Sequence, residues 1–215
     1  WDRERARSGR ISSRAEFLWT LIRSRAPGPY GVLAQVWPAD LHAWKGTLAN
    51  LPGALVVFPH ELSEVVLLRL ESALQLAGYR VRRTAGLHDL PEEVPHGRRE
   101  AWLVNEIGFL AEFYSKADWV YVGGGFGKGV HSTLEPAAFG LPIASGPARA
   151  ERFPEITWLR NIGQLHVLRS HAQIAGWIAG MPWEEGARRK EAWKAQLPLA
   201  GEPTRRLRSV LESLS

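Results

Sequence analysis

The sequence predicts an α/β domain in which a parallel sheet carries helices on both faces. Short apolar runs alternate with longer amphipathic runs along most of the chain, and this is the pattern that strand–helix–strand crossovers produce. A glycine-rich segment also lies between a late apolar run and a helical one. Hydrophobic residues make up 45% of the 215 positions and charged residues 23%, so the chain can bury a core.

The expected elements follow from periodicity and from glycine and proline positions. We expect strands at 31–36, 54–58, 79–83, 101–104, 119–122, 142–144 and 165–168, and helices at 39–50, 62–77, 109–116, 132–139, 171–180, 184–196 and 204–214. Helix 62–77 has the clearest apolar face, formed by Leu62, Val65, Val66, Leu70, Leu74 and Ala77. Residues 1–25 are expected to form a basic helical linker, and residues 26–215 a ligand-binding domain.

Composition excludes several classes of function. Cysteine is absent, which rules out disulfides, thiolate metal sites and a cysteine nucleophile. No apolar run reaches the roughly 18 residues of a membrane-spanning helix. The net charge of +5 is spread along the chain, and we interpret it as solvated surface or as attraction to an anionic lipid or substrate. No nucleic-acid recognition motif accompanies this charge, so we expect no nucleic-acid partner. The chain begins at Trp1 rather than at Met, which suggests a fragment or a processed product.

The segment 119–147 is the most informative part of the sequence. A buried strand is followed by five glycines and one lysine, and then by a helix. Glycine lets the backbone approach a ligand closely, and the start of a helix offers unpaired amides to a phosphate. Lys128 adds a cation, and Ser132 and Glu135 have the spacing of a capping box.

The alternative interpretation of this segment is a tight turn that only packs a strand against a helix. The segment is not a Walker loop, because no G-K-[ST] follows the required spacing. It is not the dinucleotide-binding fingerprint either, since that motif lies at the first strand of its fold. A late position suits a nucleotide-sugar site near the carboxyl ends of the strands.

Residues 122–143, V-G-G-G-F-G-K-G-V-H-S-T-L-E-P-A-A-F-G-L-P-I, resemble the signature of the Kdo (3-deoxy-D-manno-octulosonic acid) transferases. That family carries G-G-[SG]-hydrophobic-x-x-x-G-x-H-N-x-L-E-P-A-x-x-G-x-P. Shorter matches occur in the family's order: D-R at 2–3, V-W-P-A-D at 36–40, P-H-E at 59–61, and N-E-I-G at 105–108 followed by Leu110 and Tyr114. The resemblance covers about residues 1–180.

The resemblance implies the C-terminal, Rossmann-like half of a GT-B glycosyltransferase that needs no metal or other cofactor. The implied donor is CMP-Kdo, and the implied acceptor is a lipid A precursor of lipopolysaccharide synthesis. The enzyme would work at the cytoplasmic face of the bacterial inner membrane. The acceptor site, the membrane-associating segment and the general base belong to the family's N-terminal half, so we expect this chain alone to be soluble and inactive.

The expected donor-binding residues lie in two groups, each with an alternative structural role. They are Pro59, His60, Glu61, Gly124, Gly125, Gly127, Lys128, Gly129, His131, Ser132 and Glu135. The glycines and Lys128 would surround the donor's phosphate and carboxylate, and Glu135 would accept hydrogen bonds from the ribose, since a carboxylate has only acceptor sites. The alternatives are a solvated lysine, a packed histidine at 131, a capping glutamate at 135 and a plain turn at 59–61.

Two departures from the family pattern bear on the donor. Gln35 and Val36 replace small and hydroxyl residues, and Ser132 replaces an asparagine. They motivate a second hypothesis, in which a GT-B-like module has lost the donor and binds a partner or a membrane surface without catalysis.

Overall fold

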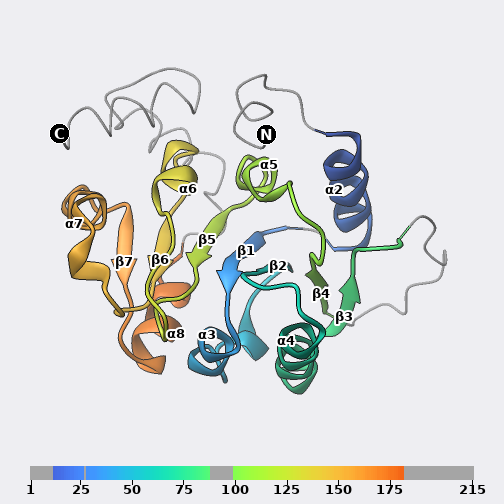
Figure 1. Cartoon of the computed structure of the whole chain (residues 1–215), viewed down its shortest axis with the longest axis horizontal. Helices are drawn as coiled ribbons and strands as arrows, with labels where there is room; N and C mark the ends of the chain where they lie inside the picture. Colours follow the sequence, from blue (N-terminus) through green and yellow to red (C-terminus); the bar gives the residue numbers. More distant parts are fainter. Residues whose placement is uncertain (1–11, 27, 88–98, 182–215) are drawn as a thin grey trace.

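The computed structural model describes residues 12–26, 28–87 and 99–181. In this part of the chain, seven strands form one sheet in the order β3-β4-β2-β1-β5-β6-β7, and all neighbouring strands are parallel (Figure 1). The strands are β1 (Tyr30–Val36), β2 (Ala54–Pro59), β3 (Arg80–Arg83), β4 (Glu100–Leu103), β5 (Trp119–Val122), β6 (Ile143–Ser145) and β7 (Leu165–Val167). Every predicted strand is present, and the predicted fold class is confirmed.

Helices cover both faces of this sheet (Figure 1). On one face lie α2 (Ser13–Arg25), α5 (Leu110–Tyr114), α6 (Leu134–Ala138) and α7 (Pro154–Asn161), and on the other lie α3 (Pro38–Ala43), α4 (Glu64–Leu76) and α8 (His171–Ala179). Two 3₁₀ turns, η1 (Leu48–Asn50) and η2 (Ala150–Arg152), complete the elements. Because strand side chains alternate between faces, Val120 and Val122 of β5 enter one core while Trp119 and Tyr121 enter the other.

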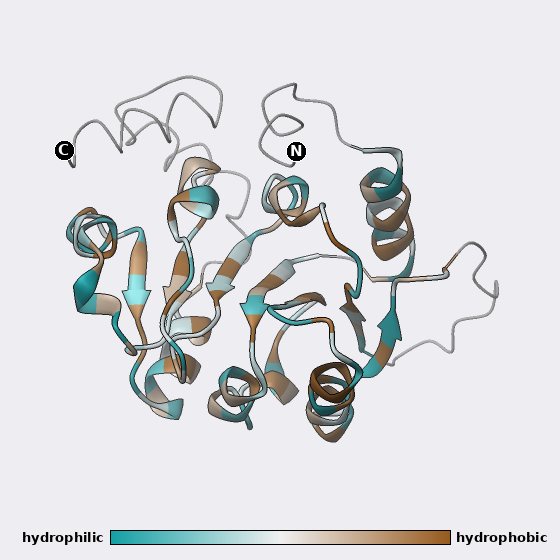
Figure 2. Cartoon of the chain, viewed as in Figure 1, coloured by the Kyte–Doolittle hydropathy of each residue, from teal (hydrophilic) through white to brown (hydrophobic). Residues whose placement is uncertain are grey.

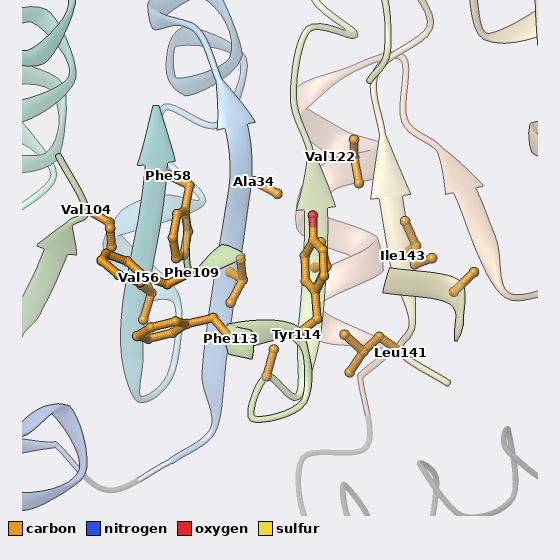
Figure 3. Packing of buried hydrophobic residues seen from close by; sticks show 14 of the residues in the cluster. Ala34, Val56, Phe58, Val104, Phe109, Phe113, Tyr114, Val122, Leu141 and Ile143 are labelled. Atoms are coloured by element: carbon orange, nitrogen blue, oxygen red, sulfur yellow. The ribbon is translucent and has the colours of Figure 1, made fainter. Parts of the chain in front are cut away.

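The core on the α5 side is built around aromatic rings. Phe58 and Phe113 pack edge to face with ring centroids 5.4 Å apart, and Trp19 of α2 meets Phe113 at 6.1 Å. Phe109 and Tyr114 are buried beside them (Figure 3). Edge-to-face pairs of this kind add to the free energy that burial of the rings already contributes.

The core on the α3 side is a tryptophan cluster beneath β5. Trp44 and Trp119 stack with ring centroids 5.7 Å apart, and Trp177 of α8 lies edge-on to both rings. The indole of Trp119 occupies the space above Gly31, where a Cβ atom would lie 2.1 Å from the ring. Gly31 is therefore required for this cluster to pack against β1.

Helix α2 fixes the described part of the predicted linker onto this domain. Ser12 caps the helix by accepting a hydrogen bond from the Ala15 amide, and its hydroxyl donates to Glu112 of α5 at 2.9 Å. Leu18 and Ile22 are fully buried in the α5-side core. The segment is helical as predicted, but the boundary at residue 25 stays a prediction.

The predicted apolar face of the helix at 62–77 is partly wrong. Leu67, Leu70 and Leu74 form the buried face of α4, whereas Val65 is 62% exposed. Figure 2 shows how strongly hydrophobic this helix is, and Leu68 also projects into solvent. The apolar face of this helix is wide enough to pack against the sheet in two orientations. Contacts with β2 and β3 select the orientation that buries Leu67, Leu70 and Leu74.

Other predicted helices differ in length or lie elsewhere. The helix predicted at 39–50 ends at Ala43 and continues as turns to η1, and the sequence analysis did not predict α7. The helices predicted at 184–196 and 204–214 lie outside the described residues, as do residues 2–3. No helix among the described residues is long and apolar enough to cross a lipid bilayer.

We predict that Gly31→Ala will lower the free energy of unfolding by about 1–3 kcal/mol, the usual cost of overpacking a core. The new methyl group would collide with the indole of Trp119, which Trp44 holds in place. Gly176→Ala is the matched control, because nothing lies within 4 Å of a Cβ atom there and alanine favours a helix. Urea unfolding should show the first variant destabilised and the second unchanged or more stable; equal effects would contradict the packing argument.

Candidate functional site

The candidate site lies at the carboxyl ends of β1 and β5. These two strands are neighbours, with Ala34 paired to Val122, but β1 leads to β2 on one side of the sheet and β5 leads to β6 on the other. In an open parallel sheet, such a switch point leaves a crevice where ligands bind. The glycine loop, residues 123–129, follows β5 directly into this position.

The carboxylate of Asp40 holds the glycine loop against the start of α3. It is 1% exposed and accepts hydrogen bonds from the Tyr121 hydroxyl at 2.7 Å and from the amides of Gly124 at 2.8 Å, Trp37 at 2.9 Å and Phe126 at 3.3 Å. Burial, followed by the nearby charge of Asp40, raises the pKa of Tyr121 well above its usual value. Tyr121 therefore stays a hydrogen-bond donor to Asp40 at physiological pH.

The glycines allow backbone segments to touch. A Cβ atom on Gly123 would lie 2.4 Å from the carbonyl oxygen of Gln35, and one on Gly125 would lie 2.3 Å from the amide nitrogen of Gly146. The Ala148 amide donates to the Gly125 carbonyl at 2.8 Å. The loop after β5 is thus packed by its backbone between the loops that follow β1 and β6.

Most of the amides in this region already have partners. The amide of Gly124 donates to Asp40, and those of Gly127 and Gly129 both donate to the carbonyl of Gly124. The expectation that these glycines surround the donor stays a prediction, but these three amides are already engaged within the protein. Their role is to fold the loop, and Gly129 does so with a positive φ of 126°.

A second set of amides has no hydrogen-bond partner among the described residues, and we call these amides open. Within the described part of the chain, the amides of Gly125, Lys128, Ser132 and Thr133 donate no hydrogen bond. Thr133 is fully buried, and its hydroxyl has no partner among the described residues either. Open amides next to a lysine form an anion-binding arrangement.

Three rings and one cation stack along the mouth of the site. The Lys128 ammonium lies 3.9 Å from the centroid of the Trp37 ring. Trp37 packs on His60 at 4.6 Å, and His60 stacks on His131 at 4.2 Å with an interplanar angle of 13°. Predicted residues from two loops, at 59–61 and 123–131, are therefore brought together around Trp37 from the loop after β1, and Lys128 is held by a cation–π contact.

His131 is poised to interact with an anion. Its Nε2 atom is buried without a hydrogen-bond partner in the described part of the chain. Burial lowers the pKa of His131 below its usual value of 6.5, the nearby His60 lowers it further, and Asp40 opposes both effects. An anion placed at this nitrogen would favour the protonated ring.

The capping box predicted for Ser132 and Glu135 is not formed. Helix α6 begins at Leu134 with Thr133 at the N-cap position, and no side chain caps it. Proline at position 136 shifts the first hydrogen-bonded turn, because it has no amide to donate. Glu135 is half-buried, and its charge adds to burial in raising the pKa of Tyr114 well above its usual value.

The remaining predicted residues lie at the same edge of the sheet with smaller roles. Pro59 ends β2, and Glu61 is exposed and forms no hydrogen bond or ion pair with a described residue. Asn105 accepts a hydrogen bond from the Ala85 amide, and Glu106 forms an ion pair with Arg14 at 3.0 Å. These two side chains join β4 to neighbouring segments.

Sequence reasoning gave no site role to Asp40 or Arg149, and it did not predict the left-handed backbone of Gln35. Asp40 could have been suspected, because it stands at the third position of a helix that begins with proline, where an acidic side chain caps the amide before the helix. Gln35 and Arg149 have positive φ values of 52° and 58°. No sequence signal marks a left-handed conformation in these residue types.

Comparisons with known proteins agree with the resemblance drawn from the motifs. No family model matches the chain. A 3-deoxy-D-manno-octulosonic acid transferase from Chlamydophila psittaci is 30% identical over 118 residues, which cover 54% of this chain. The chain spans about a quarter of that relative's length, since the match covers 26% of it.

A solved structure shares the fold over nearly the whole chain. It is the C-terminal CMP-Kdo binding domain of WaaA from Acinetobacter baumannii, with a TM-score of 0.61 and 16% sequence identity. The similarity covers 93% of this chain and 96% of that domain. The chain is therefore similar in sequence to a Kdo transferase and shares its fold with the C-terminal domain of another.

We predict that Asp40→Asn will lower the free energy of unfolding by about 1–3 kcal/mol, because an amide group would face donors that lose their acceptor. Asp118→Asn is the matched control. Asp118 accepts from the Tyr30 amide at 2.7 Å at the opposite edge of the sheet. Both variants should be less stable to urea, but only the Asp40 variant should change the binding of nucleotides. If the Asp40 variant is as stable as the wild type, the carboxylate does not hold the loop.

We also predict that His131 makes the fold less stable in mild acid. The pKa of His131 is lower in the folded state than its usual value of 6.5. Between the lowered pKa and 6.5, the unfolded chain therefore binds more protons than the folded one. The stabilisation present above pH 6.5 is lost as the pH falls through this window. Urea unfolding at pH 7.5 and 5.5 should show a smaller loss for His131→Gln than for the wild type. His171→Gln, which alters an exposed histidine of α8, should behave as the wild type does.

Proposed function

We propose that this chain, which resembles the C-terminal domains of Kdo transferases, is the donor-binding domain of a GT-B glycosyltransferase that uses CMP-Kdo. The observation that carries the proposal is the glycine loop at the switch point of the sheet. Asp40 accepts hydrogen bonds from two amides of this loop, those of Gly124 and Phe126. Among the described residues, other amides without a partner lie in the same segment as Lys128 and the unpaired ring nitrogen of His131. Such a place suits the phosphate of a nucleotide sugar.

The donor's phosphate would meet three kinds of group. Open amides at Gly125, Lys128 and Thr133 can donate to its oxygens, the Thr133 hydroxyl and His131 can add side-chain bonds, and the Lys128 ammonium supplies a full charge. Because these groups are already in position, they would also stabilise the negative charge that forms on the phosphate as the sugar departs.

Glu135 is proposed to bind the ribose. It is half-buried on the same loop–helix segment, and a carboxylate can accept hydrogen bonds from both hydroxyls of a diol. The absence of a side-chain cap on α6 removes the alternative role in which Glu135 would close a capping box. Residues 59–61 would lie near the nucleotide base, with His60 as the stacked ring closest to it.

The proposed reaction is a single displacement with inversion at the anomeric carbon. An acceptor hydroxyl would attack that carbon and lose its proton to a general base, and the bond to the phosphate oxygen would break as CMP leaves with the electron pair. The base and the site for a lipid A precursor are proposed to lie outside this sequence. The whole enzyme would act in lipopolysaccharide synthesis at the cytoplasmic face of the inner membrane, and this chain alone would bind the donor without turning it over.

A second candidate function is a non-catalytic module that has lost the donor. The left-handed Gln35 and the exposed Ser132 favour it, since both replace the family's usual residues beside the crevice. Such a module would bind a partner or a membrane surface. The two candidates differ in whether the glycine loop binds a nucleotide.

Calorimetry with CMP tests the main proposal. We predict weak but measurable binding of CMP by the wild-type chain, and a loss of about tenfold or more in Glu135→Gln and in Lys128→Ala, because each removes a charged partner. Lys116→Ala, which alters a half-buried lysine before β5 and away from the glycine loop, is the control for charge alone. No heat at millimolar CMP, with UMP or GDP binding instead, would count against CMP-Kdo as the donor.

The alternative function requires a test in the whole protein. If the chain is a donor domain, Lys128→Ala and Glu135→Gln should impair lipopolysaccharide synthesis in cells that depend on the protein. An unchanged lipopolysaccharide profile at normal protein abundance would favour the non-catalytic module.

A further inference from the structure

Two residues other than glycine adopt the left-handed conformation in the described part of the chain, and both flank the glycine loop. They are Gln35, with φ 52°, and Arg149, with φ 58°. The Gln35 carbonyl abuts Gly123 on the β1 side, and the Arg149 side chain abuts Gly129 on the β6 side. This conformation costs a residue with a Cβ atom free energy, and such strain gathers at functional sites.

The backbone around Arg149 is fixed to the glycine loop at several points. The Ala148 amide donates to Gly125 at 2.8 Å, and the Ala148 carbonyl accepts from Val130 at 3.3 Å. On its other side, Arg149 accepts a hydrogen bond from Arg152 as η2 begins. Its Cδ atom then passes within 3.0 Å of a Cβ position built on Gly129, so the aliphatic stem of the side chain lies along the loop.

The guanidinium of Arg149 has no partner in the described part of the chain. Arg14, Arg82, Arg83 and Arg169 all pair with carboxylates there, whereas the Arg149 side chain forms no hydrogen bond or ion pair with a described residue. Arg149 is an exposed cation, its backbone is strained, and hydrogen bonds of the neighbouring Ala148 hold that backbone against the glycine loop. A glycine at this position would adopt the same backbone at lower cost.

Lys128 and Arg149 lie toward different sides of the loop. The Lys128 ammonium lies over Trp37, which follows β1, and Arg149 follows β6. A nucleotide linked to a sugar acid carries two separate anions, its phosphate and its carboxylate. A planar guanidinium matches a carboxylate through two parallel hydrogen bonds, which an ammonium cannot do.

We propose that Arg149 binds the carboxylate of the donor's sugar acid, while the open amides and Lys128 bind its phosphate. This inference rests on the proposed function, because it assigns the second anion of the same donor. Arg149 is thereby a specificity residue that separates nucleotide-linked sugar acids from neutral nucleotide sugars, and its strained backbone serves to place the guanidinium beside Gly129.

The test compares two ligands and three variants in the full chain. CMP carries the phosphate alone, and freshly prepared CMP-Kdo carries both anions. Arg149→Gly removes the cation and suits the backbone, Arg149→Lys keeps the charge without the fork, and Arg152→Ala removes an equal charge from an exposed neighbour in η2. Calorimetry at one ionic strength gives each affinity, and thermal unfolding checks each fold.

We expect Arg149→Gly to weaken CMP-Kdo about ten- to hundredfold and to change CMP less than about threefold. Arg149→Lys should be intermediate, Arg152→Ala should match the wild type, and Arg149→Gly should not lower the melting temperature. Equal weakening of both ligands would overturn the assignment by placing Arg149 at the phosphate, and unchanged CMP-Kdo binding would overturn it outright. A wild-type chain that binds neither ligand would instead refute the proposed function.

Discussion

The buried carboxylate of Asp40 joins the two halves of the sheet at the one place where their connections diverge. It receives the hydroxyl of Tyr121 from β5, the amide before α3, and two amides of the glycine loop. An anion at 1% exposure is tolerated only when its oxygens are fully satisfied by donors. The loop conformation is therefore coupled to the burial of this charge, and everything that the loop presents to a ligand depends on it.

The amides of the loop region are divided between folding and binding. Those of Gly124, Gly127 and Gly129 close the turn on itself or on Asp40, while those of Gly125 and Thr133 remain open. Backbone contacts below 3 Å from the Cβ positions of the first three glycines leave no freedom to exchange these roles. The carboxylate of Asp40 therefore occupies one side of the turn, and the binding of an anion by the unpaired amides stays a prediction.

The fold followed from local patterns, whereas the details of the site did not. All seven strands were predicted because a sheet buried on both faces needs apolar runs such as those of β2 and β5. The exposed position of Val65, the early end of α3 and the missing cap on α6 depend on tertiary packing, which no local window contains. The position of Glu135 was predicted, but the contacts of Asp40 join residues more than 80 positions apart. The left-handed Arg149 has no compositional signature at all.

The short helix α6 changes the physical account of how an anion would be held here. A helix dipole acts through its first turn and grows with aligned peptide units, but α6 has five residues and a proline within its first turn. Its dipole can therefore add little to the attraction of a phosphate. The attraction must come from individual open amides, from the cation held on Trp37 and from a histidine whose pKa is lowered by burial while no anion is present. In this respect the site differs from dinucleotide-binding folds, where a long helix points at the phosphates. Here the attraction of an anion would depend on single amides and side chains, each positioned by the loop backbone.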